Sequence, residues 1–192
     1  MVILKTQRLI LKPIKKEDIK ILFQLTREKN MQKFTNIAQN KTKKELEQQI
    51  NKETEKQKEG KLLRFTISNN NTNKKQNNRN DNQNGSIGMI SLKNINKQKQ
   101  KANISYFLGE QYRGNGYMHE ACIAIINYAY TKLKLNRIEL SCSTKNKASK
   151  KVIESLNAKF EGIARQKEFL NNQFHDLRIY SILKKEWQNQ KQ

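Results

Sequence analysis

The stretch of this chain best suited to chemistry combines two glycines with a strand before it and a helix after it. The run from Gln111 to Met118 contains Gly114 and Gly116. An alternating segment over 102–108 predicts the preceding strand, and apolar residues spaced by three or four predict the following helix. Glycines let the backbone approach an anion, and free N–H groups at a helix N-terminus point at it. The pattern predicts a phosphate-binding turn, and the alternative is an ordinary turn that needs positive φ angles.

The glycine spacing distinguishes this turn from two common nucleotide motifs. It lacks the Lys-Ser/Thr ending of a P-loop and has one glycine fewer than a dinucleotide-binding fingerprint. It fits Q-x-x-G-x-G, and there it resembles the acetyl-CoA-binding motif of the GCN5-related N-acetyltransferase (GNAT) superfamily. The resemblance implies that backbone N–H groups hold the pyrophosphate of coenzyme A along Gln111, Tyr112, Arg113, Gly114, Asn115, Gly116, Tyr117 and Met118.

The strand before this turn has a special role in the resemblance. In such a fold it splays away from its neighbour, and the pantetheine arm pairs with exposed backbone, here of Tyr106, Phe107 and Leu108. A backbone N–H there would also polarise the thioester carbonyl. The expected architecture is an α/β (α+β) fold, with a mixed, mostly antiparallel, splayed sheet flanked by helices. The alternative is a strand that is paired along its whole length, which leaves no opening in the sheet.

A second motif follows a predicted strand over 136–143. Taken alone, Asn146 and Ser149 have the residue types of a turn and a helix cap. The resemblance implies an N-x-x-[AS] motif in which Asn146 contacts the pantetheine. Many GNAT members carry a tyrosine seven residues after that asparagine, as the acid that protonates the leaving thiolate, but this chain has Ile153. Ser149 is therefore the expected donor, or it only orients a water. The branch that acetylates ribosomal proteins has a serine at this point.

The C-terminal segment resembles the same branch, because residues 168–177 match its final hairpin. A carboxylate can take the proton that an ammonium must lose, provided that burial favours its protonated form. The resemblance places Glu168 at the acceptor and implies that it is the base, directly or through a water. The alternative is a surface residue paired with Lys167 or Arg165. His175 is expected to shape the acceptor site rather than to transfer protons.

Two predicted helices near the N-terminus are expected to flank the acceptor. The first has an apolar face that includes Ile19 and Leu22, and the second begins at a capping box over 42–45. The resemblance implies that the intervening segment, 30–39, is the substrate loop. Phe34 is either a contact to the acceptor or a core residue.

Length and charge set the wider limits. The 192 residues suit a single N-acetyltransferase domain over 1–192. Residues 69–84 form an Asn-rich, low-complexity loop insertion that has nothing apolar to bury. The formal net charge of +22 suits an anionic partner, or it reflects a compositional bias towards Lys, Asn and Ile. RNA binding by the insertion is the weaker interpretation, because no aromatic residues are interleaved with its basic ones.

The remaining residue types suggest a reducing compartment and no metal. Cys122 and Cys142 both lie in apolar-patterned segments and are expected to be reduced core thiols. No apolar run approaches membrane-spanning length, and the first 20 residues lack a signal-peptide core, so a cytoplasmic protein without a membrane partner is the expectation. No metal-ligand cluster or Ser-His-Asp arrangement is visible.

The resulting hypothesis is an N-acetyltransferase that uses acetyl-CoA as cosubstrate and a primary amine as acceptor, by direct attack in a ternary complex. The α-amine of a protein N-terminus, as in ribosomal proteins, is the first expectation, with possible ribosome association. A strongly cationic enzyme repels polyamines at long range, which favours protein acceptors or acidic N-terminal segments. The alternatives are a small amine such as a polyamine or aminoglycoside, a longer acyl group, and a basic RNA-associated protein without catalysis. The sequence leaves monomer and homodimer both open.

Overall fold

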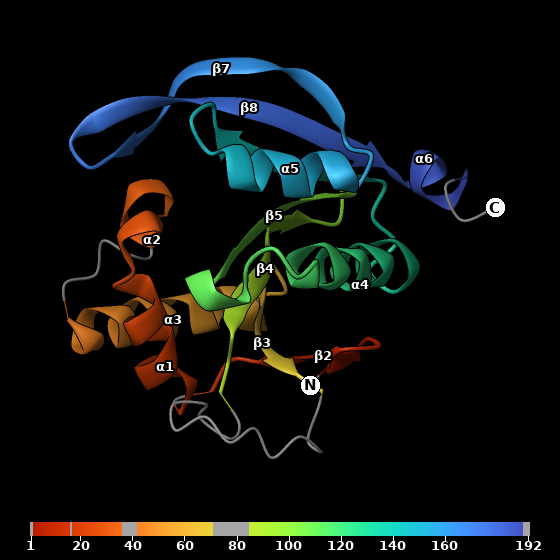
Figure 1. Cartoon of the computed structure of the whole chain (residues 1–192). Coiled ribbons are helices and arrows are strands. Elements are labelled where there is room, and N and C mark those ends of the chain that lie inside the picture. The colour runs from red at the N-terminus through yellow and green to blue at the C-terminus, as the bar shows by residue number, and fades with distance from the viewer. Residues whose placement is uncertain (1, 16, 36–41, 71–84, 190–192) are drawn as a thin grey trace.

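One eight-stranded sheet organises the chain, and its strand order is β1-β2-β3-β4-β5-β6-β8-β7. The structure is a computed structural model that describes residues 2–15, 17–35, 42–70 and 85–189. All neighbouring strands are antiparallel except β5 and β6, which run parallel. Helices flank this sheet (Figure 1), so the mixed, mostly antiparallel architecture predicted from the sequence is confirmed.

The two strands predicted over 102–108 and 136–143 are present within one residue of these bounds. The strands are β1 (Leu4–Lys5), β2 (Leu9–Pro13), β3 (Leu63–Asn69), β4 (Gly88–Asn96), β5 (Lys101–Leu108), β6 (Arg137–Ser143), β7 (Lys159–Leu170) and β8 (Gln173–Leu183). The helices are α1 (Asp18–Thr26), α2 (Lys29–Phe34), α3 (Lys43–Lys58), α4 (Tyr117–Thr131), α5 (Lys147–Ser155) and α6 (Lys184–Asn189).

Alternation along β4 and β5 divides the core between the two faces of the sheet. Ile90 and Ile104 face the larger cluster, which contains the buried stripe of α4. Met89 and Phe107 face a smaller cluster formed with the N-terminal helices α1, α2 and α3. Successive strand residues point to opposite faces, so one strand pair can serve both layers. Both clusters hold β5 in place, and β5 leads directly into the glycine turn.

The N-terminal helices agree with the sequence at the capping box and differ from it in one segment. The capping box exists, because Thr42 Oγ1 accepts from Glu45 N at 3.2 Å and Glu45 Oε2 accepts from Thr42 N at 3.3 Å. Part of the segment expected to be a substrate loop is instead the short helix α2. Met31, only 3% exposed, anchors α2 to the smaller cluster, and such packing stabilises a helix too short to persist alone. Residues 36–39 of that segment and residues 71–84 of the Asn-rich insertion lie outside the described residues.

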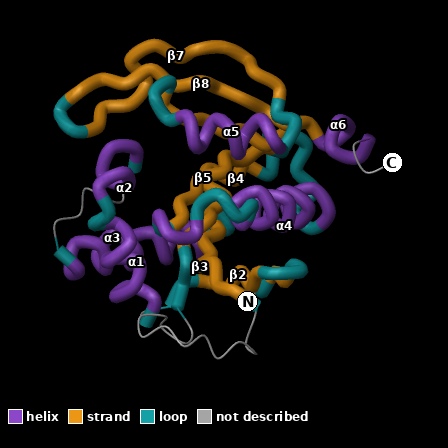
Figure 2. The backbone as a smooth tube through the Cα atoms, in the orientation of Figure 1, coloured by secondary structure: helices purple, strands orange, loops and turns teal. Residues whose placement is uncertain are grey.

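The sheet opens between β5 and β6. Their parallel register ends at Ile104 and Leu140, whereas β5 stays paired with β4 as far as Leu108. Beyond this point β6 continues to Ser143 with β8 as its partner. Residues 105–108 therefore have no partner on the β6 side, and the tube in Figure 2 leads from them through the turn into α4. The predicted splayed strand is confirmed.

Gly88 allows the close approach of β4 to β5 beside this opening. A Cβ atom at Gly88 would lie 2.3 Å from the carbonyl oxygen of Phe107 and 3.0 Å from Leu108 Cα. We expect Gly88→Ala to lower the free energy of unfolding by about 1–3 kcal/mol, because these backbone atoms cannot move without disturbing the strand pair. Urea denaturation measures this difference. Gly60→Asn is the control, because Gly60 has no atom within 4 Å of its Cβ position and asparagine tolerates the φ of +68°. Equal stability of Gly88→Ala and wild type would contradict the packing argument.

Candidate active site

A cleft of about 1370 Å³ begins where β5 and β6 separate. It extends from the glycine turn, past α5, to the side of the sheet that α2 and α3 border. Most of the predicted site residues line it: Phe34, Tyr106, Phe107, Leu108, Tyr112, Arg113, Gly114, Gly116, Tyr117, Met118, Asn146, Ser149 and Glu168. The exceptions are Gln111, Asn115 and His175, which lie next to lining residues without forming the wall themselves.

The turn before α4 presents a series of unpaired N–H groups. Gly114 and Gly116 have φ angles of +80° and +75°, which L-residues with a Cβ rarely adopt. Gly116 is the N-cap of α4, so the N–H groups of the first helical turn have no acceptor inside the helix. Among the described residues, no hydrogen bond within the chain engages the N–H groups of Gly114, Asn115, Gly116, Tyr117, Met118 and His119. Such a cradle at the positive end of a helix fits a diphosphate.

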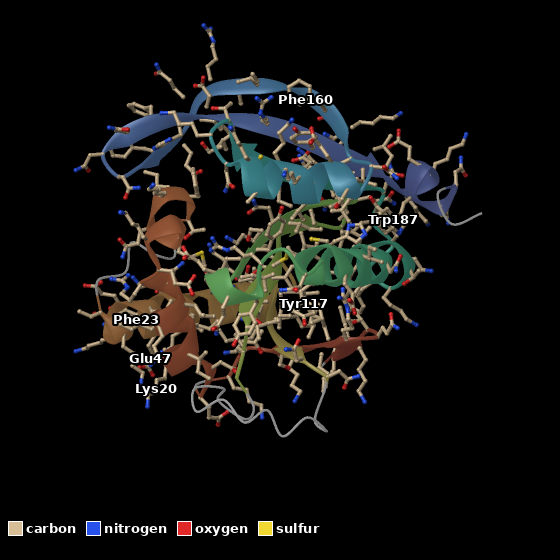
Figure 3. All side chains as sticks on the ribbon, in the orientation of Figure 1. Lys20, Phe23, Glu47, Tyr117, Phe160 and Trp187 are labelled. Carbon is tan, nitrogen blue, oxygen red and sulfur yellow. The ribbon has the colours of Figure 1, made fainter. Side chains whose placement is uncertain are left out.

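Arg8 reaches this turn from the other end of the sequence. Its Nη1 donates to the carbonyl oxygen of Asn115 at 2.9 Å, and its Nε donates to Glu120 Oε2 at 2.6 Å. Its guanidinium lies over the ring of Tyr117, 4.9 Å from the centroid, and Figure 3 labels this tyrosine at the start of α4. Arg8 also lines the cleft, so it adds a cation to the expected phosphate site. No local signal in the sequence predicts this contact.

Glu120 fixes Arg8 and the β1–β2 connection to α4. Its carboxylate accepts hydrogen bonds from the Thr6 hydroxyl and from the backbone N–H of Arg8. Burial by itself would raise the pKa of Glu120, but the hydrogen bonds from Thr6 and Arg8 outweigh burial and lower it. A favourable interaction with the helix dipole is enough to explain an acidic residue in the first turn of α4. The contacts with Thr6 and Arg8 give Glu120 a structural role as well.

Arg113 closes the start of the turn against the open strand. Its Nε donates to the carbonyl oxygen of Leu108 at 3.0 Å, and its Nη2 lies 3.7 Å from Glu28 Oε2. Glu28 Oε2 also accepts from the backbone N–H of Glu110 at 2.8 Å. One backbone group of the exposed strand end is therefore used within the chain, and Glu28, the N-cap of α2, braces the turn.

Ser149 meets Tyr106 across the opening of the sheet, and Asn146 caps the helix that carries Ser149. Asn146 is the N-cap of α5, and its Oδ1 accepts from Ser149 N at 3.0 Å, so the predicted cap is confirmed. Ser149 Oγ lies 2.9 Å from the hydroxyl of Tyr106. Burial raises the pKa of Tyr106, so its hydroxyl keeps its proton and can donate to Ser149. The residue that replaces the usual tyrosine, Ile153, is fully buried in the core.

Both cysteines are buried free thiols, as expected, but only one lines the cleft. Cys122 belongs to the core of α4, whereas Cys142 lines the cleft next to Ser149. Burial is the main reason that the pKa of Cys142 is raised, although Arg178 opposes this effect. Its thiol is therefore protonated at neutral pH and contributes shape rather than charge.

Glu168 reaches the cleft from the β7–β8 hairpin. This hairpin passes over α5 towards α2 (Figure 1), and at its tip Asn171 Nδ2 donates to the carbonyl oxygen of Gln32 at 3.0 Å. The cross-strand partner of Glu168 is His175, whose Nε2 lies 3.0 Å from the carbonyl oxygen of Leu170. Glu168 is partly buried in the cleft wall, and its role as the base stays a prediction.

Two cations on the floor of the cleft were not predicted from any sequence pattern. Arg64 on β3 is only 2% exposed, and Lys93 on β4 is partly buried. Burial lowers the pKa of both groups, and the charge of Arg64 lowers that of Lys93 further. The alternation of β3 and β4 brings them to the face that α3 borders, a consequence of sheet register rather than of any motif.

No group of three or more His, Cys, Asp or Glu side chains in residues 2–15, 17–35, 42–70 and 85–189 could hold a metal ion. Over the same ranges, none of the helices combines the length and the apolar character needed to cross a membrane.

Comparison with known protein families places this geometry among acetyltransferases. The acetyltransferase (GNAT) domain matches residues 8–159. YdaF of Bacillus subtilis (strain 168), whose provisional name is ribosomal N-acetyltransferase, is 38% identical over 104 residues, which cover 54% of this chain. That match spans little more than half, 57%, of YdaF. The uncharacterized N-acetyltransferase p20 of Bacillus licheniformis is 30% identical over 96% of this chain and 97% of its own length.

More distant relatives differ in their acceptors. Spermidine N(1)-acetyltransferase of Vibrio cholerae (serotype O1) is 24% identical over 57% of this chain and 63% of its own length. Among solved structures, the ribosomal L7/L12 α-N-protein acetyltransferase RimL in complex with coenzyme A has a TM-score of 0.81. It is 22% identical, with coverage of 95% of this chain and 98% of RimL, so it supports the fold alone.

Proposed function

The chain belongs to the acetyltransferase (GNAT) domain family, and on this premise we propose that it transfers an acetyl group from acetyl-CoA to the α-amine of a protein N-terminus. The observation that carries the proposal is the open strand end of β5, which lies in one cleft with a cradle of unpaired N–H groups and with Glu168. Ribosomal proteins are the first candidate acceptors, because the names of YdaF and RimL refer to them. This acceptor would place the enzyme at ribosomes in the cytoplasm.

The residues around the turn fit coenzyme A. The N–H groups from Gly114 to His119 would hold its pyrophosphate, and the Arg8 guanidinium lies beside them. The backbone of Tyr106, Phe107 and Leu108, left without a partner on the β6 side, would pair with the pantetheine arm. The side-chain amide of Asn146 retains N–H donors for the same arm after its oxygen has capped α5.

Two proton transfers are left to the protein. Acetyl-CoA would supply the thioester carbon that the amine nitrogen attacks and the thiolate that leaves. Glu168 would accept the proton of the incoming ammonium, directly or through a water. The Ser149 hydroxyl would donate to the departing sulfur while it takes the proton of Tyr106, whose hydroxyl lies 2.9 Å away, and solvent entering the cleft would return a proton to Tyr106. Phe34 and His175 would shape the acceptor side.

A polyamine acceptor is the second candidate, because a spermidine acetyltransferase is among the relatives. The positive charge on the cleft floor disfavours a polyamine acceptor. Lys93, whose charge is not balanced by an ion pair with any described residue, would repel a further ammonium group of a polyamine, and a repulsion of this kind grows in a partly desolvated site.

Mass spectrometry of an amine panel tests the proposal. The full chain would be incubated with acetyl-CoA and with N-terminal peptides, internal lysine peptides, spermidine and an aminoglycoside. The expected result is a mass increase of one acetyl group on the N-terminal peptides. Acetylation of spermidine alone would select the second candidate. An absence of turnover on every amine, together with salt-sensitive RNA binding, would favour a basic RNA-associated protein without catalysis.

We expect Tyr106→Phe to lower kcat about tenfold, because it removes the hydroxyl that bonds to Ser149 but keeps the ring that fills the wall. The KM for acetyl-CoA should change little. Steady-state kinetics on the best peptide of the panel measures both constants.

Tyr130→Phe is the matched control for this substitution. The Tyr130 hydroxyl donates to the carbonyl oxygen of Ile182 at 2.7 Å in the core, and Tyr130 does not line the cleft. Tyr130→Phe should lower stability by about 1 kcal/mol and leave kcat unchanged. An unchanged kcat in Tyr106→Phe would exclude the relay.

A further inference from the structure

The acceptor side of the cleft has a floor of polar side chains on neighbouring strands. Arg64 on β3 lies opposite Ser91 on β4, and Lys93 follows two residues later on the same face of β4. The Nε of Arg64 donates to Ser91 Oγ at 3.2 Å. Arg64 and Lys93 both line the same cleft as Glu168. These cations therefore border the space that an acceptor must enter.

The two cations differ in what neutralises them. Arg64 forms an ion pair with Glu53 of α3, so its charge is balanced inside the protein. Lys93 makes no hydrogen bond or ion pair with any described residue. The charges that act on it are those of Arg64 and Lys56, which repel it, and those of Glu53 and Glu168, which attract it. A partly buried ammonium without a direct partner is costly unless an anion binds beside it.

The charges of the site also define the acceptor that fits best. Arg64, Lys93 and Lys56 contribute three positive charges, and Glu53 and Glu168 contribute two negative ones, so the group carries one excess positive charge before an acceptor arrives. The acceptor amine arrives as an ammonium and adds another positive charge. A carboxylate close to that amine offsets one of these charges, whereas a polyamine adds further cations.

We propose that the acceptor carries a carboxylate close to its amine and that this carboxylate pairs with the ammonium of Lys93. The inference rests on the proposed function, and it narrows the acceptor to protein N-termini with an acidic residue in the first few positions. The amine is then held at Glu168 while the acidic side chain is held on β4. The pairing makes Lys93 a specificity-determining residue.

Peptides that differ only in charge test the inference. The set would compare Asp with Asn at the second and the third position of otherwise identical peptides with amidated C-termini, and it would include free aspartate and spermidine. Wild type should use an Asp peptide with a kcat/KM about tenfold above that of its Asn counterpart. In Lys93→Gln this ratio should fall to about one, and Lys93→Arg should restore part of it.

Lys99→Gln is the matched control. It removes the same charge from an exposed position in the turn after β4, outside the cleft wall, and should leave the ratio unchanged. Equal use of Asp and Asn peptides by wild type, or a preference that persists in Lys93→Gln, would overturn the inference and leave the proposed function standing. Acetylation of spermidine but of no peptide would overturn both. Lys93-dependent acetylation of free aspartate alone would support the carboxylate site and overturn the protein acceptor.

Discussion

Replacing Glu168 by glutamine should reduce kcat about 100- to 1000-fold with little change in the KM for acetyl-CoA. The side chain keeps its shape and its place in the cleft wall, but an amide cannot accept the proton that the ammonium must lose. Stopped-time assays with the best acceptor, at saturating acetyl-CoA, measure the loss. Retention of more than half of the wild-type kcat would show that the base lies elsewhere in the cleft.

Glu161→Gln is the matched control, because Glu161 lies on the same strand outside the cleft wall. It should leave kcat unchanged and alter acid stability instead. Hydrogen bonds from Arg137 and Ser181 lower the pKa of Glu161 to about 2, below its ordinary value of 4.5. These contacts therefore stabilise the fold above pH 4.5, and their contribution is lost as the pH falls towards 2. The variant should unfold with a weaker dependence on pH over this range.

Gly114→Val should raise the KM for acetyl-CoA at least tenfold while the overall fold persists. Gly114 has a φ angle of +80°, and a β-branched residue there costs about 1–2 kcal/mol or more. The turn would relax to a negative φ angle and redirect the N–H groups that form the cradle. Isothermal titration with coenzyme A measures the lost affinity without requiring turnover.

The Gly114→Asn variant separates an effect of backbone conformation from an effect of side-chain volume. No atom lies within 4 Å of the Cβ position of Gly114, so neither side chain meets a clash in the protein. Asparagine tolerates the left-handed region, and Asn94, Asn157 and Asn171 already adopt it in this chain. Gly114→Asn should therefore keep most of the affinity. An equal loss in both variants would assign the effect to occupied space rather than to the φ angle.

Local signals correctly predicted the parts of the site that depend on neighbouring residues. The glycine turn, the Asn146 cap and the capping box of α3 each depend on residues only a few positions apart. Side chains and φ angles within one turn of helix determine such features, so a short pattern is sufficient. The helix α2 was missed because its stability comes from Met31 packing against α1 and α3, which no local pattern records.

The sequence could not predict the cleft cations Arg64 and Lys93, or the contact between Arg8 and Glu120, for a different reason. Arg8 bonds to Glu120 across 112 positions, and Tyr106 meets Ser149 across 43. Strand order and register set these distances, and alternation along a strand gives only the face on which a side chain lies. Lys93 is one of many lysines in a chain with a net charge of +22, so its burial could not be inferred from residue type.

By itself the sequence determined the glycine turn and the strand and helix on either side of it, because glycine spacing and hydrophobic periodicity act over short stretches of chain, and the resemblance of its motifs implied the family and the fold. The tertiary structure alone decided where β5 leaves β6, which hydroxyl faces Ser149 and which cations border Glu168. Those features depend on the register of the parallel β5–β6 pair and on the passage of the β7–β8 hairpin over α5. Register is set by the packing of the whole sheet, so contacts between distant strands emerge only when the chain is folded.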